Sequence, residues 1–397
     1  MKNTVVLLIA FLALSLLFTG CKIENKPTAP VKITMCGSYY GNYDLNPYIS
    51  SNKLIVQRIL LNIAKEHKTL KEIAESLNVN PVFIEDELAH LGEADLVRSV
   101  DGMYIANGII ISNGDKNIIK PFAQTIAGQI AELIIDELDS IKLAYGKCSF
   151  KDQGFTWEQM KNLFIYTQLL DLNLIDRGFA IHRIASGKPP VHKNLGEWFL
   201  HGIEGDPIEK YALTHNICPI DSGGCAILYC DWNDKNLHPS KISFSDNDLA
   251  ILVHLYKGEK TENELMNECG LKMEEVRESL KAFTELRVVE KTGNFYKVII
   301  PIYHTKDIPI MLVTLDNISE KIIDKYCQPN LNKIEELFYK CGFGENKEQY
   351  GAFEREIFVT IVNIATQILI EKNEIPSPPT HSPWIVWGWT GNAIWDE

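Results

Sequence analysis

The sequence is short of positive charge. Its 397 residues hold 39 lysines and arginines against 52 aspartates and glutamates, which gives a formal net charge of −13 at pH 7. A chain with this balance repels nucleic acid and anionic lipid headgroups as a whole, although a local basic patch is still compatible with it. General attraction to a polyanion is therefore excluded as the basis of function.

Motifs of the common catalytic sites are also missing. The chain has no Walker loop, Gly-x-Ser-x-Gly elbow, His-Glu-x-x-His helix or paired dinucleotide glycines. Ser222 lies in a glycine-rich turn, but the sequence identifies no base for it. We therefore expect a non-enzymatic protein without a cofactor.

Metal-binding cysteine patterns are absent too. Of nine cysteines, the eight beyond Cys21 are irregularly spaced and match no zinc pattern. Cys218, Cys225 and Cys230, with His215 nearby, form the one local cluster. Buried free thiols are the favoured interpretation, a disulfide or a metal site among them stays open, and no metal site is assigned.

The amino terminus has the pattern of an export signal. Lys2 precedes an apolar run from Val5 to Phe18, which is interrupted by Ser15 and is too short for a spanning helix of about 20 residues. The following Thr19-Gly20-Cys21, after Phe18 in place of the usual leucine, resembles the lipobox of bacterial lipoproteins. That resemblance implies cleavage after residue 20 and a lipid on Cys21, which would anchor the chain on the extracytoplasmic face of the cell membrane. The alternative is an uncleaved N-terminal anchor.

Residues 52–112 predict a winged helix. Apolar residues recur at helical spacing between Asn52 and Lys65, and Thr69 and Glu72 form a capping box at the start of a second helix. Pro81 suits the first turn of a third helix. A hairpin follows, with one strand at 97–100, a turn at Asp101-Gly102 and a second strand at 103–111. The buried face of the third helix is expected at Ile84, Leu88 and Leu91.

The same pattern returns 192 residues later, from Thr69 to Thr261. Thr261 and Glu264 repeat the capping box, and Val276, Leu280 and Phe283 repeat the apolar face. Downstream, Ile130–Asp136 resembles Ile318–Asp324, and Pro189-Pro190-Val191-His192 recurs as Pro378-Pro379-Thr380-His381. An aromatic strand follows each, at Trp198 and at Trp384. Features that recur in the same order indicate a tandem duplication.

The expected fold class is therefore α+β, mainly helical, with two winged-helix units after a signal peptide. The predicted segments are 1–20 signal peptide, 21–51 tether and lead-in, 52–112 first winged helix, 113–208 helical segment and Trp strand of unit 1, 209–240 linker or insertion of the first copy, 241–304 second winged helix, and 305–397 helical segment and Trp strand of unit 2. The first unit, from Leu45-Asn46-Pro47-Tyr48-Ile49 through Gly196-Glu197-Trp198, resembles the winged-helix extension C-terminal to some sigma-70-type factors. Its lead-in is absent from the second unit, and no sigma regions accompany it. The resemblance therefore supports the fold and not a promoter role.

Neither winged helix has the charge of a DNA reader. The third helix of the first carries Glu85, Asp86 and Glu87 without lysine or arginine, whereas phosphate contacts need cations. In the second, acidic residues balance the basic ones on the third helix. The alternative function, a membrane-associated transcriptional regulator, requires one basic face made of Lys272, Arg277, Lys281, Lys291 and Lys297.

Candidate ligand or partner contacts lie in the repeated segment after each helical region. They are His192, Trp198, His201, His381, Trp384 and Trp387. Structural histidines and a strand with one buried tryptophan face are the favoured interpretation of these residues. An exported hydrolase built on His192, His201 and Cys225 is a third hypothesis. The function we expect is a membrane-anchored binding or sensing module that uses its winged helices as scaffolds; a protein or small ligand is the expected partner, and the oligomeric state is open.

Overall fold

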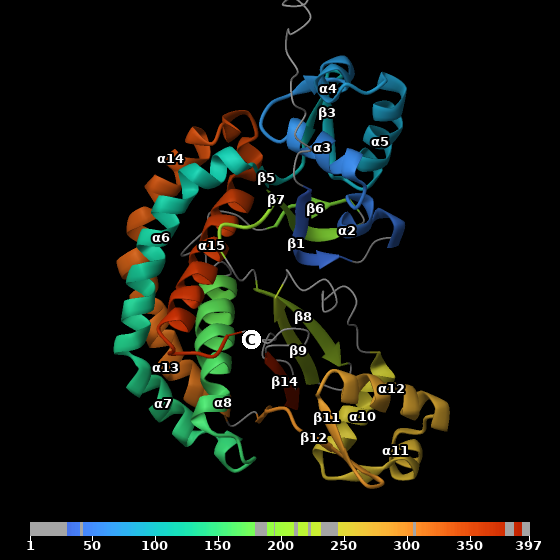
Figure 1. Ribbon diagram of the computed structural model, residues 1–397, viewed down its shortest axis with the longest axis vertical. Coiled ribbons are helices and arrows are strands. Elements are labelled where there is room, and N and C mark those ends of the chain that lie inside the picture. Colours follow the sequence, from blue (N-terminus) through green and yellow to red (C-terminus); the bar gives the residue numbers. More distant parts are fainter. Residues whose placement is uncertain are drawn as a thin grey trace, which may run out of the picture.

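The computed structural model describes residues 30–39, 43–178, 189–193, 195–209, 213–220, 224–231, 245–304, 307–377 and 385–390. The chain is mainly helical with small sheets, so the α+β class expected from the sequence is confirmed. Two helix-and-hairpin modules lie at opposite ends of a layer of long helices, and small sheets lie between them (Figure 1). We call these modules head 1 and head 2.

Head 1 has three helices and a hairpin. Its elements are α3 (Leu54–Asn62), β2 (Lys68–Thr69), α4 (Leu70–Leu77), α5 (Pro81–Glu93), β3 (Val97–Val100) and β4 (Met103–Ala106). The capping box at Thr69 and Glu72 is present, and Asn78 ends α4 in the left-handed conformation, with φ of 53°. Ile84, Leu88 and Leu91 are buried, as the apolar spacing on α5 predicted.

Head 2 repeats this arrangement. Its elements are α10 (Asp246–Tyr256), β10 (Lys260–Thr261), α11 (Glu262–Cys269), α12 (Met273–Glu285), β11 (Val289–Thr292) and β12 (Phe295–Val298). Thr261 and Glu264 form the expected capping box. The strand register is also repeated: Lys68 faces Tyr104 in head 1, and Lys260 faces Tyr296 in head 2.

The predicted second hairpin strand, 103–111, is shorter than expected. β4 ends at Ala106, and the chain then leaves the hairpin to form β5 (Ile109–Ile111) in a different sheet. Gly108 permits this exit, because a side chain there would collide with Leu200. Head 1 is thereby joined directly to the sheet that contains β5.

Two mixed sheets lie between the heads and the helical layer. The first has the order β1 (Val31–Tyr39), β7 (Gly196–Glu204), β5, with β6 (Val191–His192) also paired to β7. The second has the order β13 (Ile302–His304), β14 (Ile385–Thr390), β9 (Gly224–Asp231), β8 (Leu213–Ile220). In both, the Trp strand pairs parallel with the strand after the hairpin and antiparallel with a strand that precedes the head.

The expected linker at 209–240 is therefore wrong in part. β8 and β9 form a hairpin, and β9 pairs with β14 from the end of the chain. Since β9 stands to head 2 as β1 stands to head 1, this stretch belongs to the second half of the chain. An isolated hairpin has little stability of its own, so it joins the sheet whose edge is open.

The helical layer contains helices from both halves of the chain. Those of the first half are α6 (Asn113–Asp136), α7 (Leu138–Lys147), α8 (Trp157–Asn162) and the π-helical η3 (Leu163–Arg177); those of the second are α13 (Asp307–Ile322), η5 (Ile323–Cys327), α14 (Leu331–Lys340) and α15 (Tyr350–Glu371). The described residues also include these short elements: η1 (Tyr43–Leu45), α2 (Pro47–Ser50), η2 (Ser149–Lys151), η6 (Gln328–Asn330), η7 (Phe343–Glu345) and η8 (Lys347–Gln349).

The helices pack reciprocally across this layer. α6 of the first half packs against α15 of the second, and α13 of the second packs against η3 of the first. This is the pattern of an isologous dimer interface, in which each partner offers the same surface to the other, here within one chain. Neither half buries its own helices without the other.

α6 is long and apolar enough to cross a membrane by length and composition alone. Its apolar residues, among them Ile119, Ala123, Ile126 and Ile130, are buried in the main hydrophobic core. We therefore interpret α6 as a core helix, because packing against α15 explains its composition.

The two heads differ in how they join the core. Head 1, the first sheet and the helical layer share one continuous apolar core. Head 2 has a smaller core of its own, which includes Ile251, Leu265, Val276 and Phe283. Head 1 is therefore packed into the body of the protein, whereas head 2 forms a separate packing unit.

Asn346 joins the second half to head 1. Its buried Nδ2 donates to the carbonyl oxygens of Ala64 at 3.1 Å, Ala106 at 3.0 Å and Gly108 at 3.4 Å, and its Oδ1 accepts from Arg98 at 2.8 Å. Removing such an amide leaves buried carbonyls without a donor.

We expect Asn346→Ala to lower the free energy of unfolding by about 3 kcal/mol, since several buried hydrogen bonds are lost together. Urea denaturation followed by circular dichroism measures this change. The control is Asn332→Ala, an exposed change on α14, for which we expect an effect within about 0.5 kcal/mol. Equal effects of both substitutions would show that Asn346 does not hold head 1 to the second half.

Candidate functional site

His192 and Trp198 are buried and contact each other. The His192 ring stacks on the Trp198 ring with a centroid separation of 3.5 Å, and both side chains are fully buried. His192 Nδ1 lies 3.0 Å from the Asp95 carboxylate, and its Nε2 lies 2.7 Å from the carbonyl oxygen of Trp198. Each ring nitrogen thus has an oxygen within hydrogen-bond distance. Neither side chain is therefore presented to solvent as a ligand or partner contact in this arrangement.

His201 is buried as well, on β7 facing α15. Its Nδ1 lies 3.2 Å from a Glu356 carboxylate oxygen, but neither ring nitrogen makes a hydrogen bond to a described residue. A partner could not reach His201 from solvent without movement of the surrounding elements. His192 and His201 therefore do not form an accessible catalytic pair.

The remaining candidates of the repeated segment fall largely outside the described residues. His381 and Trp384 lie there, and so does Cys21, the predicted site of lipid attachment. Trp387 is part of β14, where its backbone pairs with Ile227 of β9. Cys225 is likewise placed only as part of the β9 backbone.

The five candidate DNA contacts do not form one basic face. Arg277 Nε donates to Glu262 at 2.8 Å, and Lys291 lies 3.8 Å from the same carboxylate and over the Tyr296 ring. Lys297 pairs with Glu290, so it points to the opposite side of the hairpin from Lys291. Arg277 and Lys291 are thus already paired with an acid, and Lys297 faces away from them. Lys272 is the N-cap residue of α12, and Lys281 lies on that helix.

Head 1 presents apolar residues where a DNA reader would present cations. Val82 and Phe83 in the first turn of α5 are exposed, Phe83 by 66%, and Val100 and Met103 are exposed at the hairpin tip. Glu87 on α5 holds Lys53 at 2.8 Å. A surface of this kind fits a protein partner better than phosphate.

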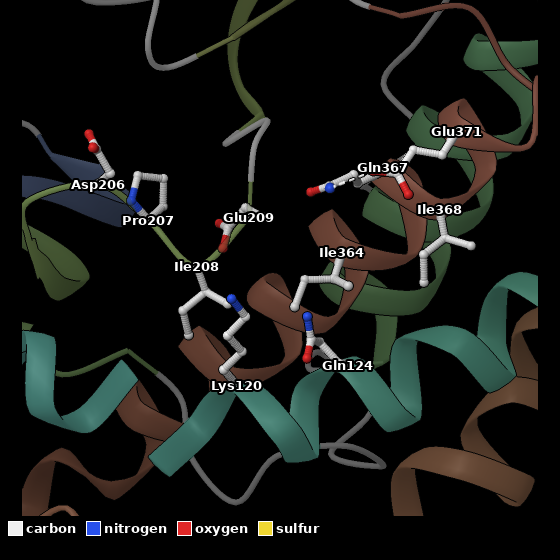
Figure 2. A pocket seen from close by; sticks show the side chains of 10 residues that line it. All are labelled: Lys120, Gln124, Asp206, Pro207, Ile208, Glu209, Ile364, Gln367, Ile368 and Glu371. Atoms are coloured by element: carbon white, nitrogen blue, oxygen red, sulfur yellow. Dashed lines mark hydrogen bonds between the residues drawn. The ribbon is translucent and has the colours of Figure 1, made fainter. Parts of the chain in front are cut away.

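A pocket of about 540 Å³ lies between α6, α15 and the segment that follows β7. Figure 2 shows its walls: Lys120 and Gln124 come from α6, four residues from α15, and the remainder from the segment after β7. The apolar part is made by Pro207, Ile208, Ile364 and Ile368, and the polar part by Lys120, Gln124, Asp206, Glu209, Gln367 and Glu371. Since α6 and α15 come from different halves, the pocket exists only where the halves meet.

Glu209 is the unusual residue of this pocket. It is only 5% exposed, and its Oε1 accepts from Asn363 at 3.2 Å. Its Oε2 has no hydrogen-bond partner among the described residues. Burial, reinforced by the Glu356 carboxylate, raises the pKa of Glu209 to about 8. The side chain is therefore mostly a neutral acid at pH 7, with a donor and no acceptor in place.

Lys116 fixes the segment that carries Glu209. Its ammonium donates to the carbonyl oxygens of Glu204 at 2.7 Å and Asp206 at 2.6 Å, and partial burial lowers its pKa. Asn113, at the start of α6, donates to the Glu204 carboxylate at 2.8 Å. These contacts hold the end of β7 against α6, so that Glu209 faces α15.

No pattern in the sequence indicated this pocket. Glu209 lies at the border between the expected Trp strand and the expected linker, and Lys120 and Glu371 are ordinary charged residues on long helices. Only the packing of α6 on α15 brings them together. Glu209 is recognised as a candidate site residue by its burial and raised pKa in the folded protein, and not by the residues next to it in the sequence.

The thiols with described side chains are structural. Cys148, Cys269, Cys327 and Cys341 are free. Burial raises the pKa of Cys148, Cys327 and Cys341 to about 12. Such groups are neutral and unreactive near pH 7. Among the described residues, no group of three or more histidine, cysteine or acidic side chains is placed to hold a metal ion.

Comparison with known proteins adds no relative: no family model, curated protein or solved structure matches this chain.

Proposed function

We propose that this protein is a non-enzymatic lipoprotein, anchored through Cys21, that binds a small ligand and acts as a sensing module with two winged-helix scaffolds. The observation that carries the proposal is the pocket between α6 and α15, into which a buried Glu209 brings a carboxyl oxygen that has no hydrogen-bond partner among the described residues. A polar group buried without a partner is costly unless another molecule supplies the partner.

The position of the pocket supports a sensing role. One wall is α6, which follows head 1 in the chain, and another is α15, which comes after head 2. A ligand that contacts both walls stabilises the arrangement in which the halves are packed together. Loss of the ligand would then favour any other arrangement of the two heads.

We propose that heads 1 and 2 are winged helices that arose by tandem duplication. Their common element order, the repeated capping boxes and the repeated strand register support this. Left-handed residues recur at the same spacing, Asp95 with φ of 56° and Arg287 with φ of 57°. A partner surface on head 1, around Phe83, follows from the exposed apolar residues of α5 and the hairpin tip.

The membrane-associated DNA reader is less well supported by the geometry. Arg277 and Lys291 share Glu262, and phosphate would have to displace this carboxylate before it gained either cation. The acidic surface of head 1 would repel DNA as well. A wild-type protein that is neither lipid-labelled nor digested from outside the cell would favour this function.

Lipid labelling combined with protease digestion of intact cells tests the anchored location. We expect the wild type to take up a labelled fatty acid and to be digested from outside, and Cys21→Ser to remain unlabelled. The control substitution is Cys269→Ser, which changes a thiol of head 2 and should leave labelling unchanged. A wild type that is unlabelled and protected would overturn the proposal and favour the membrane-held regulator.

A further inference from the structure

The walls of the pocket carry more negative than positive charge. Glu209 and Glu371 contribute carboxyl groups, and a third belongs to Asp206, whose exposed carboxylate lies 3.7 Å from Lys32. Lys120 is the one lysine or arginine among the residues lining the pocket. Gln367 Nε2 already donates to Glu371 at 2.7 Å, which fixes that carboxylate at the rim. A ligand that brings positive charge therefore meets complementary groups, whereas an anion does not.

The apolar part of the pocket defines the rest of the ligand. Pro207 and Ile208 lie on one side, and Ile364 and Ile368 project from α15 (Figure 2). Aliphatic side chains of this kind contact a hydrocarbon body and offer it no hydrogen bonds. A hydrated metal ion would leave these surfaces unused.

We propose that the pocket binds an aliphatic ammonium ion, whose head replaces the proton of Glu209 and whose hydrocarbon body packs against Ile208, Ile364 and Ile368. The proposal rests on the ligand-binding function proposed above and names the class of ligand.

The proton balance of binding follows from the groups around Glu209. The charges that act on it directly are Glu356 on α15 and Lys116 on α6, and Lys120, Asp206 and Glu371 line the same pocket. Behind these, His201 lies beside Glu356, and Glu204 lies beside Lys116. Burial keeps the proton on Glu209 while the pocket is empty, and repulsion from the Glu356 carboxylate adds to this effect. A bound ammonium compensates this repulsion. The Glu209 proton then passes to the buffer, and no covalent bond to the ligand is made.

Three probes of equal length test the charge of the ligand: n-pentylammonium, 1-pentanol and pentanoate, each titrated calorimetrically into the full-length protein in detergent. We expect n-pentylammonium to bind at least about tenfold more tightly than 1-pentanol, and pentanoate to bind least. At pH 7, titrations in buffers of different ionisation enthalpy should show close to one proton released per ammonium bound, because the pKa of Glu209 is about 8.

Variants separate the ligand class from the pocket itself. Glu209→Gln should remove the preference for ammonium over alcohol and the proton release, while Asp139→Asn, an exposed acid-to-amide change on α7, should leave both unchanged. Ile368→Trp should fill the pocket and weaken every probe.

Equal binding of alcohol and ammonium by the wild type, lost in Ile368→Trp, would overturn the ammonium assignment and leave the ligand-binding function standing. Ammonium binding that survives Ile368→Trp, or no binding of any probe, would overturn the assignment to this pocket. Circular dichroism of each variant checks folding; Glu209→Gln replaces a neutral acid by a neutral amide and is expected to fold.

Discussion

Glu209→Gln is expected to stabilise the protein at pH 8 by about 4 kcal/mol, although it creates no new contact with a neighbouring residue. The amide keeps the oxygen that accepts from Asn363. It cannot ionise, so it avoids the cost of placing a charge beside Glu356 in a buried site. The gain arises because ionisation of Glu209 stabilises the unfolded wild type, whereas the folded wild type must keep the proton or ionise at a cost; glutamine has no such difference.

The sign follows from the pKa of Glu209, which is about 8 in the folded protein and 4.5 as its ordinary value. Between these values the unfolded chain has released the proton while the folded chain keeps it. Stability contributed by the neutral acid is therefore fully present below about pH 4.5 and is lost by about pH 8. The slope is about 1.4 kcal/mol per pH unit in that window.

Urea denaturation of the wild type and Glu209→Gln at pH 5, 6, 7 and 8 measures this effect as a difference that grows with pH. Glu371→Gln is the matched control, because this exposed carboxyl lies in the same pocket and should give no such slope. A difference that is constant between pH 5 and pH 8 would mean that Glu209 ionises normally in the folded protein.

The heads were predictable because their signals are local. A capping box needs residues three apart, a buried helix face needs residues three and four apart, and a tight turn needs a residue that tolerates the left-handed conformation. Thr69, Glu72, Asn78 and Pro81 satisfy these requirements within one short stretch of chain. Tertiary packing then agreed with the local pattern.

The start of α6 was a local signal that the sequence interpretation missed. Ser112 and Asp115 form a capping box that begins the helix well before Ile130, where the repeated motif lies near its end. Gly114 and Pro121 weaken the helical pattern in the first turns. The chain continues as a helix because Ile119 and Ala123 bury their side chains against the core.

Local patterns could not predict the pocket, nor that β9 pairs with the last strand of the second half. Both depend on pairings between residues far apart in sequence, such as α6 with α15 and β9 with β14. Periodicity shows that a helix face or a strand is buried, but it does not name the partner. The sequence predicted two similar halves, and the packing of α6 on α15 forms the site.

The repeated histidine illustrates the limit of inference from a repeat. His192 and His381 recur in matching motifs, which suggested one shared role. Asp95, which holds His192, corresponds at the spacing of the heads to Arg287, and a cation cannot form the same contact with a histidine. His192 therefore has a partner that the second half does not repeat at this position.

His192→Ala is expected to lower the free energy of unfolding by about 3 to 5 kcal/mol. The substitution removes the contacts to Asp95 and to the Trp198 carbonyl, leaves the Asp95 carboxylate with Lys193 at 3.9 Å as its remaining ion-pair neighbour, and opens a cavity beside the Trp198 ring. Because these contacts join the turn after α5 to the start of β7, the loss weakens the attachment of head 1. Urea denaturation at pH 7 measures the change.

The control is His254→Ala on α10, whose pair with Glu268 is partly exposed and should contribute less than about 1 kcal/mol. A double-mutant cycle with Asp95→Asn isolates the charged contact, since asparagine also tolerates the left-handed backbone that Asp95 adopts. We expect a coupling of about 1 to 3 kcal/mol between His192 and Asp95. A coupling near zero, with His192→Ala still destabilising, would assign the stabilisation to the stack on Trp198 and the cavity, and would leave the charge of Asp95 without a structural role.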